Sequence, residues 1–202
     1  MQRIESGRLR GRRLHPLPKG VDGLRPTAAR VRGAIFDRLA PALAGARVLD
    51  LFAGSGALSF EAISRGASHA TLIELDGRVV RHLRAEAVAL GVTEQVNVVQ
   101  GDAAAVLRRR ASASPYDLVL IDPPFARPDI IDVLVSALAP HWLAPDAIVV
   151  CERERVRGQS VLVHWPACFE LEVTRIYGQA EVEFRRYAPR VDGFERGDDA
   201  TP

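Results

Sequence analysis

Short apolar segments alternate with helical segments between residues 46 and 153, and this alternation limits the possible folds more than any other feature. The expected strands are 46–51, 69–75, 95–100, 116–122 and 147–153, and the expected helices between them are 56–66, 77–91, 103–111 and 128–140. Strands separated by helices pair in parallel, and the helices then cover both faces of the sheet. The pattern therefore predicts an α/β protein of the Rossmann-like type.

The segments on either side of this alternation differ from it. Residues 24–43 predict a helix, because apolar side chains recur every four positions from Val31 to Leu43. Residues 169–177 and 180–187 are β-type runs separated by two residues, which is typical of a hairpin. We therefore expect seven strands, with a mostly parallel sheet that an antiparallel C-terminal hairpin closes.

Composition excludes several classes of protein. The chain has 202 residues, which suits a single domain, and no apolar run approaches the roughly 18 residues that a membrane span requires. The N-terminus has charge but no apolar core of a secretory signal. Cys151 and Cys168 lack metal-ligand spacing and suit reduced thiols. We expect a cytoplasmic protein with no membrane contact and no metal site.

Charge is distributed unevenly along the chain. Residues 1–32 carry nine Lys/Arg and two Asp/Glu, a net charge of +7, whereas the remainder has a net charge of −5. A basic arm over residues 1–24 indicates a polyanionic partner such as RNA, because each neutralised phosphate releases counterions. The alternative is a solvated, flexible terminus. The arginines that we expect to contact RNA are Arg8, Arg10, Arg12, Arg13 and Arg127, the last beyond the fourth strand.

A glycine-rich turn follows the first expected strand. Asp50 ends that strand, and Gly54-Ser55-Gly56 leads into the next helix. Glycines let the backbone approach a ligand, and a helix N-terminus offers free N–H groups. The turn also fits nucleotide-dependent dehydrogenases, but Ser59 stands where their fingerprint has its third glycine.

Acidic residues also end the next two strands. Glu74 lies about 20 residues after the glycine turn, where an acid accepts hydrogen bonds from ribose hydroxyls. Asp102-Ala103 follows the third strand and suits an adenine edge, although Asp102 is also a candidate helix N-cap. Acids at three consecutive strand ends, together with the glycine turn, indicate a nucleoside-type cofactor.

The fourth expected strand ends in Asp122-Pro123-Pro124-Phe125. Proline lacks an N–H and fixes φ, so the two prolines hold the turn rigid without offering competing donors. The Asp122 carboxylate and the Pro123 carbonyl form a pair of acceptors that matches the two N–H bonds of an amine. Phe125 suits stacking on the ring that carries the amine. The turn therefore predicts catalysis at the exocyclic amine of a nucleobase, with Asp122, Pro123 and Phe125 as catalytic residues.

These residues resemble the class I S-adenosylmethionine-dependent methyltransferases that modify exocyclic amines. The resemblance narrows to the bacterial 16S ribosomal RNA (guanine-N2)-methyltransferases, which act on guanine 966. It is carried by the segments RIESGRLRGRRL, GLRPTAARVRGAIFDRL, FAGSGALSFEAISRGA, TLIELD, DPPF and RIYGQAEVEFRRY. It covers the chain from Arg3 to about Tyr187. Gly33 and Asp37 depart from the family, which often has Glu and Asn there.

The resemblance implies which residues contact each part of the cofactor. It places Asp50 and the glycine turn around the methionine part of S-adenosylmethionine, Glu74 on the ribose and Asp102 near the adenine. Arg25 and Thr27 are implied to border the cofactor pocket and its entrance. The division that follows is a basic arm over 1–24, a methyltransferase domain over 25–189 and a disordered tail over 190–202.

Two other functions remain open at this point. A DNA adenine-N6 methyltransferase uses the same chemistry but usually carries a separate region that recognises DNA, and about 50 residues remain after the fifth strand. A non-catalytic RNA-binding module is the other alternative, although every chemical position is filled. Without a recognition domain, we expect the substrate to be 16S rRNA in an assembled or assembling small ribosomal subunit. We also expect a monomer, because the fold needs no partner to complete its sheet.

Overall fold

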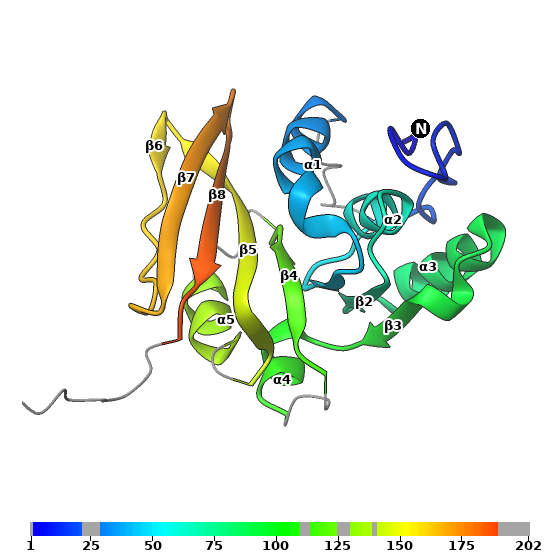
Figure 1. Ribbon diagram of the computed structural model, residues 1–202. Helices are drawn as coiled ribbons and strands as arrows, with labels where there is room; N and C mark the ends of the chain where they lie inside the picture. The colour runs from blue at the N-terminus through cyan, green and yellow to red at the C-terminus, as the bar shows by residue number, and fades with distance from the viewer. Residues whose placement is uncertain (1, 22–28, 110–113, 125–129, 139–140, 190–202) are drawn as a thin grey trace, which may run out of the picture.

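The computed structural model describes residues 2–21, 29–109, 114–124, 130–138 and 141–189. Its sheet has the order β3-β2-β1-β4-β5-β8-β7, and β6 pairs with β5 outside that order (Figure 1). The five parallel strands are β1 (Arg47–Asp50), β2 (His69–Glu74), β3 (Val96–Gln100), β4 (Tyr116–Ile121) and β5 (Leu143–Val156). The predicted α/β alternation is confirmed, with the β1–β4 pair at its centre.

Two antiparallel strands complete one side of the sheet, as predicted. β7 (Phe169–Tyr177) and β8 (Ala180–Tyr187) form the C-terminal hairpin, and β8 pairs with β5. The hairpin turns at Gly178, which has a φ of 63° that glycine adopts without strain.

Among the residues that the structure describes, the sheet has eight strands, so the prediction of seven is wrong by one. The additional strand is β6 (Gln159–Ser160), which pairs with the end of β5. β5 continues beyond the predicted end at residue 153, and Arg157 and Gly158 form a two-residue loop with φ values of 51° and 78°. Positive φ at both loop positions matches the twist of a tight hairpin. A two-residue strand has no apolar periodicity from which it can be predicted.

Helices cover both faces of the sheet. One face carries α1 (Ala29–Leu43), α2 (Ala57–Ser64) and α3 (Gly77–Leu90), and the other carries α4 (Ala103–Leu107) and α5 (Ile130–Leu138). Successive strand residues face opposite cores, because Leu118 and Leu120 pack with α1–α3 whereas Val119 and Ile121 pack with α4 and α5. A short 3-10 helix, η1 (Thr93–Gln95), leads into β3. No helix of the described residues is long and apolar enough to cross a membrane.

The described part of the N-terminal arm packs against α2 and α3. Three of its apolar side chains are at most 7% exposed and join the core beneath α1–α3: Ile4, Leu9 and Leu14. Gly7 has a φ of 77°, and a Cβ there would lie 1.9 Å from the Ser64 carbonyl oxygen, so a larger residue cannot fit. The alternative of a solvated, flexible terminus is therefore wrong for residues 2–21.

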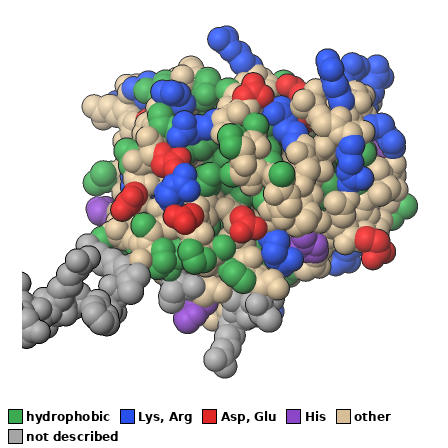
Figure 2. All heavy atoms as spheres, viewed as in Figure 1, with side chains coloured by type: hydrophobic (Ala, Val, Ile, Leu, Met, Phe, Trp, Pro, Cys, Tyr) green, Lys and Arg blue, Asp and Glu red, His purple; other side chains and the backbone are tan. Residues whose placement is uncertain are grey.

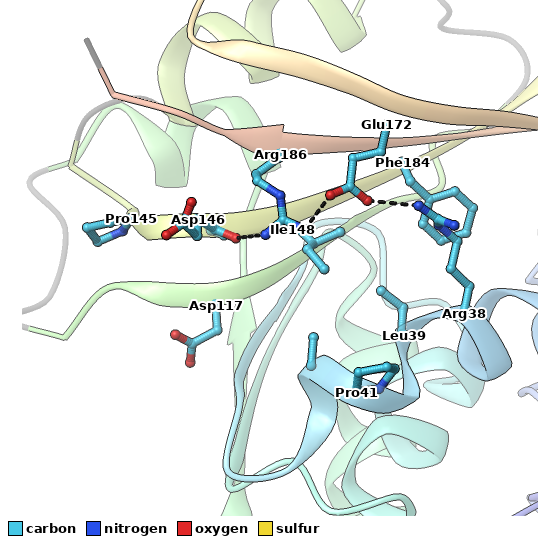
Figure 3. A pocket seen from close by; sticks show the side chains of 12 residues that line it. Arg38, Leu39, Pro41, Asp117, Pro145, Asp146, Ile148, Glu172, Phe184 and Arg186 are labelled. Carbon is cyan, nitrogen blue, oxygen red and sulfur yellow. Dashed lines mark hydrogen bonds and ion pairs between the residues drawn. The ribbon is translucent and has the colours of Figure 1, made fainter. Parts of the chain in front are cut away.

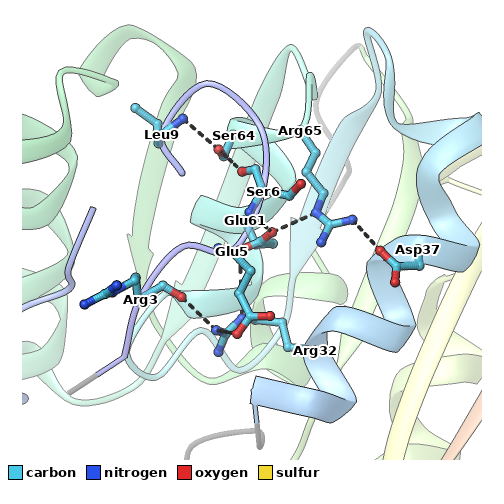
Figure 4. A network of polar contacts seen from close by, with 9 residues as sticks. All are labelled: Arg3, Glu5, Ser6, Leu9, Arg32, Asp37, Glu61, Ser64 and Arg65. Carbon is cyan, nitrogen blue, oxygen red and sulfur yellow. Dashed lines mark hydrogen bonds and ion pairs between the residues drawn. The ribbon is translucent and has the colours of Figure 1, made fainter. Parts of the chain in front are cut away.

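Polar contacts also fix the arm to the helices (Figure 4). Glu61 of α2 accepts hydrogen bonds from the Glu5 N–H at 2.8 Å and the Ser6 N–H at 3.1 Å. Arg32 of α1, which is 2% exposed, donates to the Arg3 carbonyl at 2.8 Å and to Glu5 Oε1 at 3.0 Å. A buried guanidinium requires such partners, because leaving it unpaired would cost several kcal/mol. The arm, α1 and α2 therefore form one packed unit.

Candidate active site

The carboxyl ends of the parallel strands meet along one edge of the sheet, and the candidate site lies there. β2 and β3 extend from one side of β1, whereas β4 and β5 extend from the other. Open α/β sheets bind ligands beside such a change of direction. Asp50 and Glu74 end β1 and β2, and Asp122 directly follows β4. The fold therefore brings these three predicted site residues to one edge.

Asp50 is buried, with 1% of its surface exposed. Its carboxylate accepts hydrogen bonds from the Ser59 hydroxyl at 2.7 Å and the Phe52 N–H at 3.3 Å. Burial raises the pKa of Asp50 to about 7; the hydrogen bonds oppose this rise, and the charges of Asp122 and Glu74 add to it. The departure from the dehydrogenase fingerprint has a structural reason, since Ser59 ties α2 to the end of β1.

Glu74 holds the glycine turn in place. Its Oε2 accepts the Gly54 N–H at 3.1 Å, and its Oε1 accepts the Asp76 N–H at 2.9 Å. Gly54 and Gly56 have φ values of 50° and 76°, a conformation that favours glycine. A Cβ on Gly56 would lie 2.4 Å from the Phe60 ring, so this glycine also lets the turn pack against α2. One carboxylate thus connects the ends of β1 and β2.

These groups fit S-adenosylmethionine. Gly56 is the N-cap of α2 and provides no side-chain cap, which leaves the positive end of the helix for an anionic group such as the methionine carboxylate. The half-buried Glu74 uses one site on each oxygen, and a carboxylate has about four acceptor sites, so it retains capacity for ribose hydroxyls. Ser55 is half-buried between the two glycines.

Asp102 serves as a helix cap in this structure. It is the N-cap of α4, its Oδ1 accepts the Ala105 N–H at 2.9 Å, and its side chain is exposed. Ala103 is buried in the core beneath α4 and α5. Asp102 thus caps the helix, as the alternative interpretation had it. Contact of Asp102 and Ala103 with adenine stays a prediction, and Asp102 Oδ2 is the atom that would make it.

The Asp-Pro-Pro turn directly follows β4, as predicted, and so begins at the switch point between β1 and β4, where the direction of the strand order changes. Asp122 is half-buried, Pro123 is buried and Pro124 is exposed. The carboxylate of Asp122 lies near enough to Asp50 to raise its pKa. Four of the predicted site residues lie outside the described residues: Phe125 and Arg127 after this turn, and Arg25 and Thr27 before α1.

Glu152 is a candidate site residue that the sequence analysis did not identify. It lies near the carboxyl end of the parallel part of β5, is 8% exposed, and its Oε2 has no hydrogen-bond partner among the described residues. Burial raises the pKa of Glu152 to about 8, and the negative charge of Asp122 adds to the rise. The available signal was an acid after the apolar run of residues 147–151, the fifth acid at the end of an expected strand.

Four of the arginines that we expect to contact RNA lie on the docked arm. Arg8, Arg10, Arg12 and Arg13 are all exposed. Arg8 donates to Gln95 of η1, and Arg12 donates to the Ala89 carbonyl of α3 at 2.5 Å. Lys and Arg side chains gather in the upper right of Figure 2, where Figure 1 places the arm. The arm therefore presents its positive charge from a fixed position.

A cavity of about 440 Å³ lies at the opposite, amino-terminal edge of β4 and β5. Its wall includes an ionic cluster in which Glu172 bonds to Arg186 and, at 2.9 Å, to Arg38 (Figure 3). One carboxylate thus pairs with two guanidinium groups and connects α1, β7 and β8. Of the predicted site residues, those that the structure describes do not line this cavity, and it lies at the opposite edge of the sheet from them.

Comparison with known proteins identifies the family. A family model described as Conserved hypothetical protein 95 matches residues 2–186. The chain belongs to this family. It is 38% identical over 197 residues to ribosomal RNA small subunit methyltransferase D of Escherichia coli, covering 97% of this chain and 94% of the relative.

Solved structures agree with this membership. The yhhF protein of Escherichia coli superposes with a TM-score of 0.82 at 37% identity, covering 94% of this chain and 99% of that one. A methyltransferase from Thiobacillus denitrificans, described as S-adenosylmethionine-dependent and solved with S-adenosylhomocysteine, has a TM-score of 0.53 at 26% identity. That similarity covers 68% of this chain and 53% of the other.

Proposed function

We propose that this protein transfers the methyl group of S-adenosylmethionine to the N2 amine of a guanine in 16S ribosomal RNA, at the position equivalent to guanine 966. Family membership and the similarity to a ribosomal RNA methyltransferase over nearly the full length support methylation of ribosomal RNA. The chain is an S-adenosylmethionine-dependent methyltransferase of ribosomal RNA.

The observation that carries the proposal is the position of the Asp-Pro-Pro turn. Asp122 lies at the β1–β4 switch point, on the same sheet edge as Glu74 and the glycine turn. A base amine is a poor nucleophile because its lone pair is delocalised into the ring. Two fixed acceptors can orient both N–H bonds and favour a more tetrahedral nitrogen. The turn supplies such acceptors as Asp122 and the Pro123 carbonyl.

The roles of the residues follow from this geometry. S-adenosylmethionine, when bound, supplies an electrophilic methyl group. Glu74 holds the ribose, and Asp122 stabilises the positive charge that develops on the base amine. Asp122 does not need to be a strong base, because the amine loses a proton readily once it has become positively charged. Phe125 stacks on a base that has been turned out of its helix or loop.

The basic N-terminal arm is the part of the protein that we expect to bind the RNA of the small ribosomal subunit. The docked arm carries four exposed arginines, and their charge supports a role in neutralising RNA phosphates. We propose that a monomer in the cytoplasm modifies an assembled or assembling small subunit. No separate domain for base recognition occurs among the described residues, and folded RNA with its bound proteins would then present the guanine.

The decisive experiment measures transfer of labelled methyl from S-adenosylmethionine to small subunits taken from a strain that lacks this protein. Nucleoside analysis of the 16S RNA should place the label in N2-methylguanosine. Label that appears in N6-methyladenine of added DNA instead would replace the proposed substrate by DNA. If the protein binds the cofactor but no nucleic acid becomes labelled, neither 16S RNA nor DNA is its methyl acceptor.

A further inference from the structure

Strand register places Glu152 beside Asp122. Ile121 of β4 pairs with Cys151 of β5, so the next residues along each strand are neighbours at about 4.8 Å between strands. Side chains alternate between the two faces, and Leu120 and Val150 lie in the core beneath α1–α3. Asp122 and Glu152 therefore both point to that face, at the carboxyl edge of the sheet.

One oxygen of the Glu152 carboxyl group has no partner in the part of the chain that the structure describes. Glu152 Oε2 is buried and has no hydrogen-bond partner among the described residues. The neighbouring Arg153 points to the opposite face, where it pairs with Glu181 and Glu183. A buried acceptor without a partner destabilises a fold, and such groups concentrate at functional sites.

Guanine provides a donor that suits this second carboxyl group. The ring N1–H of guanine is adjacent to the C2 amine, whereas N1 of adenine and of 2-aminopurine carries no hydrogen. A carboxyl group has an acceptor oxygen in both its ionised and its protonated form. We propose that Glu152 accepts the N1–H of the target guanine while Asp122 holds the N2 amine, so that the two acids together select guanine. This inference rests on the proposed function and specifies how its base is recognised.

A variant can test this without unfolding the protein. Glu152→Leu replaces a buried carboxyl, one oxygen of which has no partner among the described residues, with an apolar group of similar volume, a change that is often neutral or stabilising. Glu152→Gln keeps an acceptor oxygen at the same place. Glu154→Leu is the matched control, since Glu154 lies two residues further along the same strand and on the same face. Thermal melting and calorimetric binding of S-adenosylmethionine verify each variant.

The substrates are small subunits reconstituted with 16S RNA that carries either guanine or 2-aminopurine at the target position. 2-Aminopurine keeps the amine but lacks the N1–H. We expect the wild-type protein to prefer guanine by about 10- to 100-fold, the value of one strong hydrogen bond. Glu152→Leu should lower this ratio to near one, Glu152→Gln should retain most of it, and Glu154→Leu should leave it unchanged.

The contrary outcomes separate this inference from the proposed function. The role of Glu152 would be overturned if Glu152→Leu kept the wild-type preference for guanine over 2-aminopurine. It would also be overturned if the Leu and Gln variants lost this preference equally, and in both cases the methyltransferase assignment would stand. A wild-type protein that methylates no guanine N2 in the 16S RNA would overturn the proposed function, and the inference with it.

Discussion

Ser59 donates a hydrogen bond of 2.7 Å to Asp50, and both residues are buried at the start of the cofactor edge. The pair joins α2 to β1 across the glycine turn. Ser59→Ala should lower the free energy of unfolding by about 1–3 kcal/mol, because a buried carboxyl then loses a partner. It should also weaken S-adenosylmethionine binding, since the turn loses a support.

Urea unfolding and calorimetry measure the two effects of that change. Ser136→Ala on the exposed side of α5 is the matched control and should alter neither quantity. Equal stability of Ser59→Ala and the wild-type protein would show that the Asp50 contact is not structural.

Asp50 should make stability depend on pH. Its pKa is raised from 3.8 to about 7, mainly by burial, so the folded state favours the protonated acid. The contribution of Asp50 to the free energy of unfolding is fully present below about pH 4 and is lost as pH rises through about 7. This contribution amounts to about a few kcal/mol. Asp50→Asn should remove this dependence. Unfolding free energies of both proteins between pH 4 and pH 8 should therefore differ by an amount that changes with pH; a constant difference would contradict the raised pKa.

Asp122→Asn should abolish most methyl transfer while leaving cofactor binding nearly intact. The amide retains the size of the side chain but loses the negative charge that stabilises the developing positive charge on the amine. We expect turnover to fall by about 10²–10³-fold, the usual effect of removing one electrostatic contact to a transition state. Single-turnover rates and calorimetry separate the two effects, and an equal loss of both would mean that Asp122 serves the cofactor.

Glu74→Ala should raise the dissociation constant of S-adenosylmethionine. The change removes the proposed ribose acceptor and also releases the Gly54 N–H that holds the turn. A loss of about 10-fold or more is expected from one charged hydrogen bond. Glu94→Ala in exposed η1 is the control. Calorimetry that finds the same affinity in Glu74→Ala as in the wild-type protein would contradict the ribose assignment.

Periodicity was sufficient to predict the parallel sheet, both helical layers and the C-terminal hairpin, because each depends on local patterns of apolar residues. It also placed Asp50, Glu74, Asp102 and Asp122 at the ends of expected strands, and the carboxyl ends of parallel strands share an edge of the sheet. Periodicity could not predict contacts between segments that are distant in the sequence. The place of Gly7 against Ser64 requires the docked arm, and the proximity of Glu152 to Asp122 requires the register of β4 and β5.

The arm should contribute to RNA affinity through charge. Deleting residues 1–24 would not test this cleanly, because Ile4, Leu9 and Leu14 would leave the core. Replacing Arg8, Arg10, Arg12 and Arg13 with Gln keeps those apolar contacts and removes four positive charges. RNA affinity should fall, and the slope of log K against log salt should become shallower by up to about 3–4, since each of four phosphate contacts contributes about 0.7–0.9. Binding titrations between 50 and 200 mM salt measure the slope. Four Lys replacements at the same positions keep the charge and should retain the wild-type slope, and a slope unchanged by the Gln variant would exclude the arm from the RNA interface.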